Sequence, residues 1–105
     1  MLNEANKERC RRIIGRYGYR PQLGMVLEKT AELIKACSDL QKATCKMLRK
    51  GTCAVEFSEN FKEELADVVA MCEQARQMAN VSESEINRRV EAKLEKVIVS
   101  VSHKL

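Results

Sequence analysis

The chain has 105 residues, of which 45% are hydrophobic and 32% are charged, and its net charge is +4. This is the length of one small domain, and such a chain can bury roughly 65% of the surface that it exposes when unfolded. Four glycines, one proline and no tryptophan leave few residues for tight turns, which argues against a β-sandwich or barrel. We therefore expect one all-α domain over residues 1–105, an antiparallel bundle of about four helices.

The first predicted helix covers residues 3–17, with Ile13 and Ile14 as its apolar anchors. Six basic side chains lie in the first twenty residues: Lys7, Arg9, Arg11, Arg12, Arg16 and Arg20. Such an arm either contacts nucleic acid or another phosphorylated ligand, or is a solvated helix face. The stretch "YGYRPQ" then predicts a break, because Pro21 fixes its own φ and disfavours helical geometry at Arg20.

The second predicted helix begins at Pro21 or Gln22 and ends at Arg49, with Gly51 closing it. Its apolar residues recur at helical intervals and are expected to face the core: Leu23, Leu27, Ile34, Leu40, Ala43 and Met47. Whether Ser38-Asp39 interrupts this helix stays open at this point. Residues 50–58 are predicted to form a loop.

The third predicted helix covers residues 59–80 behind an N-cap at Ser58, with five residues facing inward: Phe61, Leu65, Val68, Val69 and Cys72. The fourth begins at "SESE", where Ser82 and Glu85 have capping-box spacing. Its apolar residues, spaced every three or four positions from Ile86 to Val101, predict a core face or a dimer seam. The tail "VIVSVS" alternates like a strand, so the last eight residues have no clear assignment.

The five cysteines include no C-x-x-C pair, and the chain has one histidine, which makes a zinc site improbable. No stretch approaches the ~20 apolar residues that span a bilayer. These features favour a reduced, cytoplasmic protein without membrane contact, in which the cysteines act mostly as small buried hydrophobes.

Acidic residues recur one helical turn apart in two places. Glu28 and Glu32 share a face of the second predicted helix, and Glu64 and Asp67 share a face of the third. Carboxylates at this spacing repel one another unless a cation neutralises them, and Mg²⁺ or Mn²⁺ prefers such oxygen ligands. The alternative is a solvated helix face, in which Glu32 pairs with a neighbouring lysine.

The order "YGYRPQL", "LEKTAELIKA", "KMLRKG" and "FKEELADVVAMCEQ" resembles the MazG-like family of all-α nucleoside triphosphate pyrophosphohydrolases, in particular the short single-domain bacterial and phage forms. The likeness covers about residues 17–94, and the family signature is E-E-x-x-E followed by E-x-x-D. Glu28 and Glu32 match the first and last Glu of the first motif, and Glu64 and Asp67 match the second.

The resemblance implies a dimerising helical bundle that binds Mg²⁺ through these four carboxylates. A (d)NTP would be cleaved between its α- and β-phosphates to a (d)NMP and pyrophosphate, with Glu32 and Glu64 as the catalytic residues. Charge neutralisation and an oriented water are the main requirements of this reaction.

Lys29 stands where the family has the second Glu of E-E-x-x-E, a metal-ligand position. Three interpretations follow. In the first, Glu28 binds the metal together with Glu32 while Lys29 contacts a phosphate. In the second, the ammonium occupies a metal position and weakens cation binding severely. In the third, the pocket is a relic in a helical module that binds a nucleotide or a partner. A small basic nucleic-acid-binding protein is a further alternative.

Other polar residues are candidates for substrate contact. Lys35, Lys46 and Arg49 could meet phosphates, the arginine in bidentate fashion, or serve solubility alone. Gln22, at the family's Gln-Leu position, is expected to face the base or to cap the helix.

Overall fold

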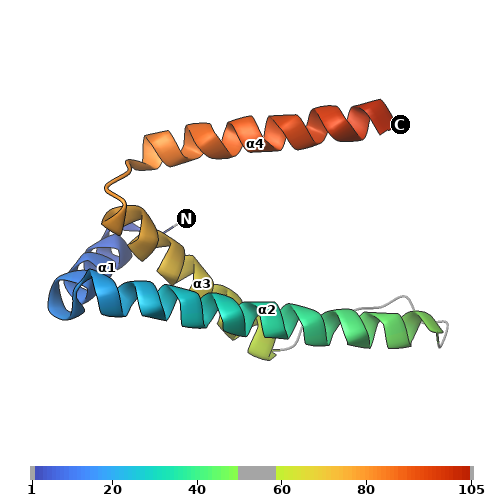
Figure 1. Cartoon of the computed structure of the whole chain (residues 1–105), viewed down its shortest axis with the longest axis horizontal. Helices are drawn as coiled ribbons and strands as arrows, with labels where there is room; N and C mark the ends of the chain where they lie inside the picture. Colours follow the sequence, from blue (N-terminus) through green and yellow to red (C-terminus); the bar gives the residue numbers. More distant parts are fainter. Residues whose placement is uncertain (1, 50–58, 105) are drawn as a thin grey trace. The chain divides into compact units, whose positions relative to one another are not determined.

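A computed structural model of the chain describes residues 2–49 and 59–104. These residues form four helices and no strand: α1 (Glu4–Tyr17), α2 (Tyr19–Arg49), α3 (Glu59–Met78) and α4 (Glu83–Lys104) (Figure 1). The all-α prediction is therefore confirmed. The predicted closure at Gly51, the loop over 50–58 and the cap at Ser58 lie outside the described residues. None of the described helices combines the length and apolarity needed to cross a membrane.

The chain divides into two compact units, Met1–Ala75 and Arg76–Leu105. In the first unit α1 begins where the side chain of Asn3 accepts a hydrogen bond of 2.8 Å from the backbone N–H of Asn6. α1 ends at Gly18, whose N–H donates to the carbonyl of Ile14 at 2.8 Å. Gly18 has φ 89° and ψ 168°, a conformation essentially confined to glycine.

The break predicted over "YGYRPQ" is narrower than expected, because α2 already begins at Tyr19 and includes Arg20 and Pro21. Pro21 lies in the first turn, where a backbone N–H has no helical partner to lose, so proline is tolerated there. The first backbone hydrogen bond of α2 is donated by Gln22, the residue after Pro21. Its N–H binds the carbonyl oxygen of Gly18 at 3.3 Å. Gly18 is therefore the one residue that separates α1 from α2.

α2 runs without interruption through Ser38 and Asp39. Its inward face differs in part from the predicted one: Leu23, Leu27 and Ile34 are exposed, whereas Leu40 is half-buried one turn after the buried Ala36. Gln22, which was not predicted to face inward, is buried. At 3.6 residues per turn the three exposed residues form one stripe, on the side of the helix roughly opposite to Ala36. The helical spacing of these apolar residues thus places them on one side of α2, as predicted, but this side faces away from the described part of its own unit.

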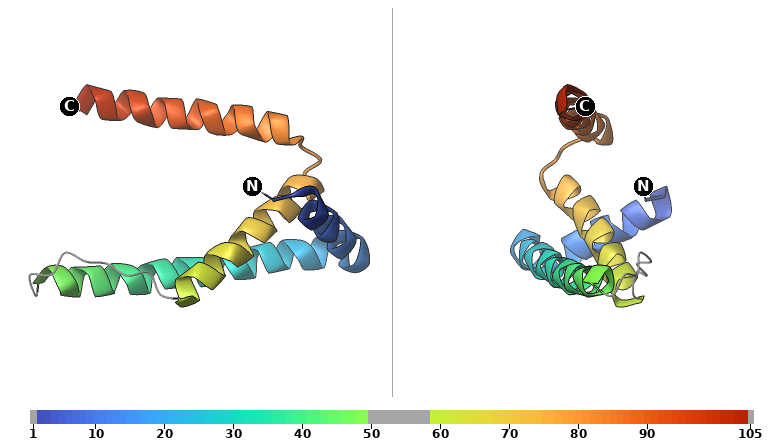
Figure 2. Two further views of the ribbon diagram at one scale, coloured as in Figure 1. Left: turned by 180° about the vertical axis from the view of Figure 1, so that it is seen from behind. Right: turned by 90° about the vertical axis from the view of Figure 1, so that its right-hand side faces the viewer.

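α3 crosses α2 and also contacts α1 (Figures 1 and 2). The thiol of Cys10, which is buried with Ile14, lies 3.9 Å from the carbonyl oxygen of Ala70. Burial in this contact raises the pKa of the Cys10 thiol, and the charge of Glu73 raises it further. Cys10 therefore behaves as the small hydrophobe that was predicted.

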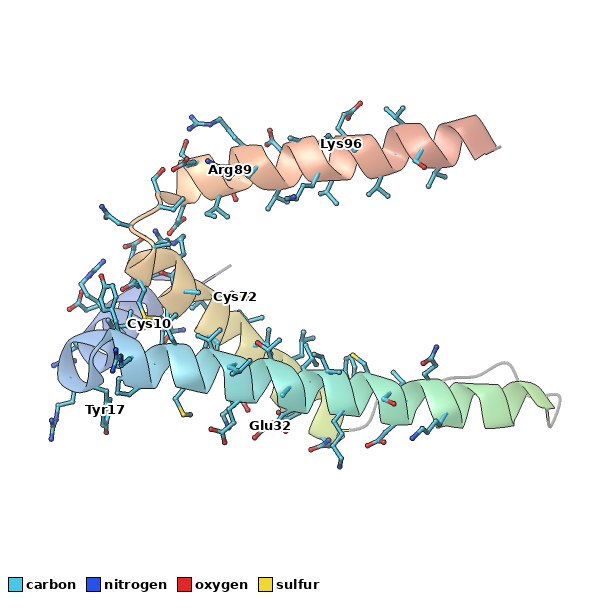
Figure 3. All side chains as sticks on the ribbon, viewed as in Figure 1. Cys10, Tyr17, Glu32, Cys72, Arg89 and Lys96 are labelled. Atoms are coloured by element: carbon cyan, nitrogen blue, oxygen red, sulfur yellow. The ribbon has the colours of Figure 1, made fainter. Side chains whose placement is uncertain are left out.

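Other inward assignments were wrong. Cys37, Ile13 and Leu65 are exposed, and so is Cys72, which Figure 3 labels on α3. The inward residues Phe61, Val68 and Val69 are half-buried. The most deeply buried side chain of α3 is polar: Gln74 is 2% exposed. Gln74 lies seven residues after Asp67 and four before the buried Met78, and so on one face with both.

The second unit contains the end of α3 and all of α4. Asn80, with φ 55°, ends α3, and Arg76 closes the turn with a 2.8 Å hydrogen bond from its guanidinium to the Val81 carbonyl. Ser82 caps α4 as predicted, because its hydroxyl accepts a 3.1 Å hydrogen bond from Glu85 N–H. The tail is helical to Lys104. The apolar stripe of α4 is largely exposed, at Val90, Leu94, Val97 and Val101.

Candidate metal centre

Four charged side chains of the first unit meet where α3 crosses α2. α2 provides Lys29 and Glu32, and α3 provides Glu64 and Asp67; Figure 3 shows Glu32 at this crossing. One carboxylate oxygen from each of Glu32, Glu64 and Asp67 lies within 4.8 Å of the other two. The three carboxylates are half-buried.

Helical spacing explains how each helix contributes two groups. Lys29 and Glu32 are three residues apart on α2, and Glu64 and Asp67 are three apart on α3, so each pair lies on one face. The crossing of the helices then sets the distance between the pairs. Two residues per helix are enough to build a compact cluster from four side chains.

Lys29 is the cation of this cluster. Its ammonium nitrogen lies 3.4 Å from Glu32 Oε2 and 3.9 Å from Asp67 Oδ2. The charge of Glu32 and the hydrogen bond to it raise the pKa of Lys29 against the opposing effect of burial, and the charges of Asp67 and Glu28 add smaller contributions. Lys29 is therefore protonated at neutral pH and links the two helices.

Glu64 has the least favourable electrostatic environment of the three carboxylates. Desolvation raises the pKa of its carboxyl, and so do the hydrogen bond with Glu32 and the negative charges of Glu32 and Asp67; Lys29 acts in the opposite direction. Its Oε2 atom is buried and accepts no hydrogen bond from the described residues. A buried carboxylate oxygen without a partner is costly, and a proton or a cation would relieve the cost.

The other predicted site residues lie apart from this cluster or outside what can be described. Glu28 is exposed and is not one of the three converging carboxylates, although its charge acts on Lys29. Lys35 is exposed, and the side chains of Lys46 and Arg49 lie outside the described residues. Gln22 is 6% exposed in the first turn of α2.

One buried polar residue on the same face of α3 as Asp67 was not predicted from the sequence. The buried Gln74 has a side-chain oxygen that accepts no hydrogen bond from the described chain. The signal was present, because Asp67, Met71, Gln74 and Met78 follow one another at intervals of four, three and four residues. A search for apolar residues alone passes over a glutamine in such a row.

The donor set fits a small divalent cation in type and in charge. Carboxylate oxygens are the ligands that Mg²⁺ and Mn²⁺ prefer, and oxygens within 4.8 Å of one another can share one ion. With all groups ionised, the three carboxylates and the Lys29 ammonium carry a net charge of −2, opposite to that of one divalent ion. The ammonium nevertheless occupies space beside two of the three oxygens and competes for them.

Comparisons of the chain with protein-family models, with curated proteins and with solved structures found no significant match.

Proposed function

We propose that this chain is a divalent-cation-dependent nucleoside triphosphate pyrophosphohydrolase of the MazG-like type, which converts a (d)NTP and water to a (d)NMP and pyrophosphate. The observation that carries the proposal is the convergence of Glu32, Glu64 and Asp67 across two helices. These three residues occupy positions of the E-E-x-x-E and E-x-x-D signature. Three of the four carboxylates that the resemblance selects are thus the three that converge, which supports the proposal.

In this proposal Glu32, Glu64 and Asp67 would hold Mg²⁺ or Mn²⁺, and the ion would supply charge neutralisation for the triphosphate. Glu32 and Glu64 are the proposed catalytic residues, which orient the attacking water and accept its proton. Water attacks one of the two phosphorus atoms joined by the α,β-bridging oxygen, the bond from that phosphorus to the bridging oxygen breaks, and a (d)NMP and pyrophosphate are released.

Lys29 has two effects in this scheme. Its ammonium weakens binding of the cation by competing for Glu32 and Asp67, and once displaced it can pair with a phosphate oxygen. We therefore propose an activity that needs a higher cation concentration than a site with a carboxylate at position 29 would need. Lys35, Lys46 and Arg49 remain candidate phosphate contacts, and Gln22 a candidate contact to the base.

The ion pairs of Lys29 also favour a second candidate function. An ammonium that already neutralises the cluster can replace the metal permanently, which leaves a helical module that binds a nucleotide or a partner without turnover. The two candidates differ in pyrophosphate release, which is absent in the second.

We further propose that the chain forms a homodimer, in which a second copy covers the exposed stripe of Leu23, Leu27 and Ile34. Leu27 is 74% exposed, and three large apolar side chains in one row are costly to leave in water. A helix with inward-facing residues on one side and an apolar stripe on the other is typical of the middle layer of a larger bundle.

The enzymatic proposal is tested by measuring pyrophosphate release from a panel of (d)NTPs with Mg²⁺ or Mn²⁺. We expect release by the wild type and its loss in Asp67→Asn, which keeps the size of the side chain. Glu95→Gln on α4 removes one carboxylate outside the cluster and should retain activity. Equal activity in the wild type and Asp67→Asn, or none in the wild type at any cation concentration, contradicts the proposal.

A further inference from the structure

The corner between α1 and α2 has an unusual composition. It reads Arg16-Tyr17-Gly18-Tyr19-Arg20 and contains both tyrosines of the chain, each next to an arginine. Tyr17 is 60% exposed and Tyr19 is 56% exposed, although tyrosine rings are usually packed against other side chains. Figure 3 shows Tyr17 on the outer side of this corner. Gly18, with φ 89°, separates the last residue of α1 from the first of α2.

Arginines outnumber carboxylates around this corner. Between Glu8 and Glu28 the sequence has five arginines and no carboxylate. Arg12 and Arg20 are exposed and form no ion pair with the described residues, whereas Arg11 pairs with Glu8 and Lys7 with Glu4. Arg12 and Arg16 are one helical turn apart on the same side of α1. Positive charge without local neutralisation therefore gathers at one end of the first unit.

The geometry of Arg16 and Tyr17 adds a second feature. The guanidinium carbon of Arg16 lies 5.6 Å from the centroid of the Tyr17 ring, a cation–π contact. The ring is thus held beside a positive charge while more than half of its side chain stays in contact with water. An aromatic face next to a fixed cation can accept a flat ring and a neighbouring phosphate at once.

We propose that this corner binds single-stranded nucleic acid, with Arg12, Arg16 and Arg20 contacting phosphates and Tyr17 and Tyr19 stacking on unpaired bases. Single-strand binding combines a positively charged path with aromatic platforms, and stacking tolerates any base. A duplex offers phosphates but keeps its base faces stacked internally, so it would leave the tyrosines without partners. This proposal uses none of the residues of the carboxylate cluster and stands apart from the pyrophosphohydrolase.

The composition of the chain supplies a direct test. Because the protein has two tyrosines and no tryptophan, its intrinsic fluorescence comes from Tyr17 and Tyr19. Titration of the full chain with short oligo(dT) should quench this fluorescence as bases stack on the rings. Fluorescence anisotropy of labelled oligo(dT) then measures affinity across a range of salt concentrations.

The variants separate stacking from charge. Tyr17→Ala should weaken binding roughly tenfold, and Tyr17→Phe, which keeps the ring, should restore it. Replacing Arg12, Arg16 and Arg20 by Gln should lower the slope of log affinity against log salt by about 2. The matched control replaces Arg88, Lys93 and Lys96 of α4 by Gln, removes the same charge, and should leave quenching intact.

The proposal is overturned if oligo(dT) causes no quenching, or if the α4 control weakens binding as much as the corner variant. It is equally overturned if a duplex or vesicles of anionic lipid bind as tightly as oligo(dT). Asp67→Asn should bind oligo(dT) like the wild type, so that failure of the hydrolase and failure of this surface are distinguishable.

Discussion

The ammonium nitrogen of Lys29 on α2 lies 3.9 Å from a carboxylate oxygen of Asp67 on α3. The same nitrogen lies 3.4 Å from Glu32, so one lysine neutralises carboxylates of both helices at their crossing. A divalent ion that binds Glu32, Glu64 and Asp67 has to displace this ammonium or share the oxygens with it. The behaviour of the cluster toward protons and cations therefore depends on Lys29.

Glu64→Gln should stabilise the metal-free protein at neutral pH. Because the pKa of Glu64 is raised above its ordinary value of 4.5, the folded state takes up this proton more readily than the unfolded state. The ionised carboxylate consequently costs stability at neutral pH, and the cost disappears as the pH falls through the folded pKa to below 4.5. In the presence of chelator, circular dichroism should show a higher melting temperature for Glu64→Gln than for the wild type at neutral pH. This difference should vanish at about pH 4.

Glu63→Gln is the matched control for that measurement. Glu63 is the exposed neighbour of Glu64 on α3 and is not one of the converging carboxylates. We expect no comparable pH-dependent gain from it. A stability difference for Glu64→Gln that is the same at neutral and acidic pH would show that ionisation of Glu64 is not its source.

Gly18→Ala should destabilise the first unit by about 1–3 kcal/mol, because the backbone of Gly18 has a conformation that other residues adopt only with strain. Gly15→Ala inside α1 should have the opposite effect, a gain of about 0.5–1 kcal/mol, since alanine is the better helix former. Apart from the adjoining residues and the backbone of its own helix, a Cβ atom at either position would meet no atom within 4 Å, so the two variants do not differ in side-chain packing. Urea unfolding of both variants checks it, and equal effects would exclude backbone strain at Gly18.

Leu27→Glu should convert a dimer to a monomer, because it places a charge in the middle of the exposed apolar stripe of α2. Sedimentation equilibrium of the wild type and the variant over a range of concentrations measures the change. Ala92→Glu, at an exposed position of α4, tests whether added charge alone has this effect. A wild type that is monomeric at all concentrations would mean that a second copy does not cover this face.

The sequence predicted the helices well because their signals are local. Asn3, Gly18 and Ser82 act within one turn of a helix end, and the spacing of Glu64 and Asp67 already places them on one face. Pro21 misled us for the same reason, since a proline that interrupts a helix and one that starts a helix look alike in sequence.

Tertiary arrangement was less predictable. The apolar period of α2 identifies the stripe of Leu23, Leu27 and Ile34 but cannot say whether it faces its own unit, and here it does not. The meeting of Lys29 with Asp67 depends on the angle at which α3 crosses α2, which no local spacing encodes. The position of the lysine in a carboxylate motif was visible in the sequence; its role as a link between helices was not.

Lys29→Glu tests whether Glu32, Glu64 and Asp67 bind a catalytic cation against competition from Lys29. Calorimetric titration with Mn²⁺ and pyrophosphate release from (d)NTPs should be measured on the same preparations, with Lys93→Glu on α4 as the control for charge. We predict that Lys29→Glu binds Mn²⁺ at least roughly tenfold more tightly than the wild type, since one competing ammonium becomes a ligand, and releases pyrophosphate at lower cation concentration. Unchanged Mn²⁺ affinity and unchanged activity in Lys29→Glu would show that position 29 is not beside the cation and would contradict the account.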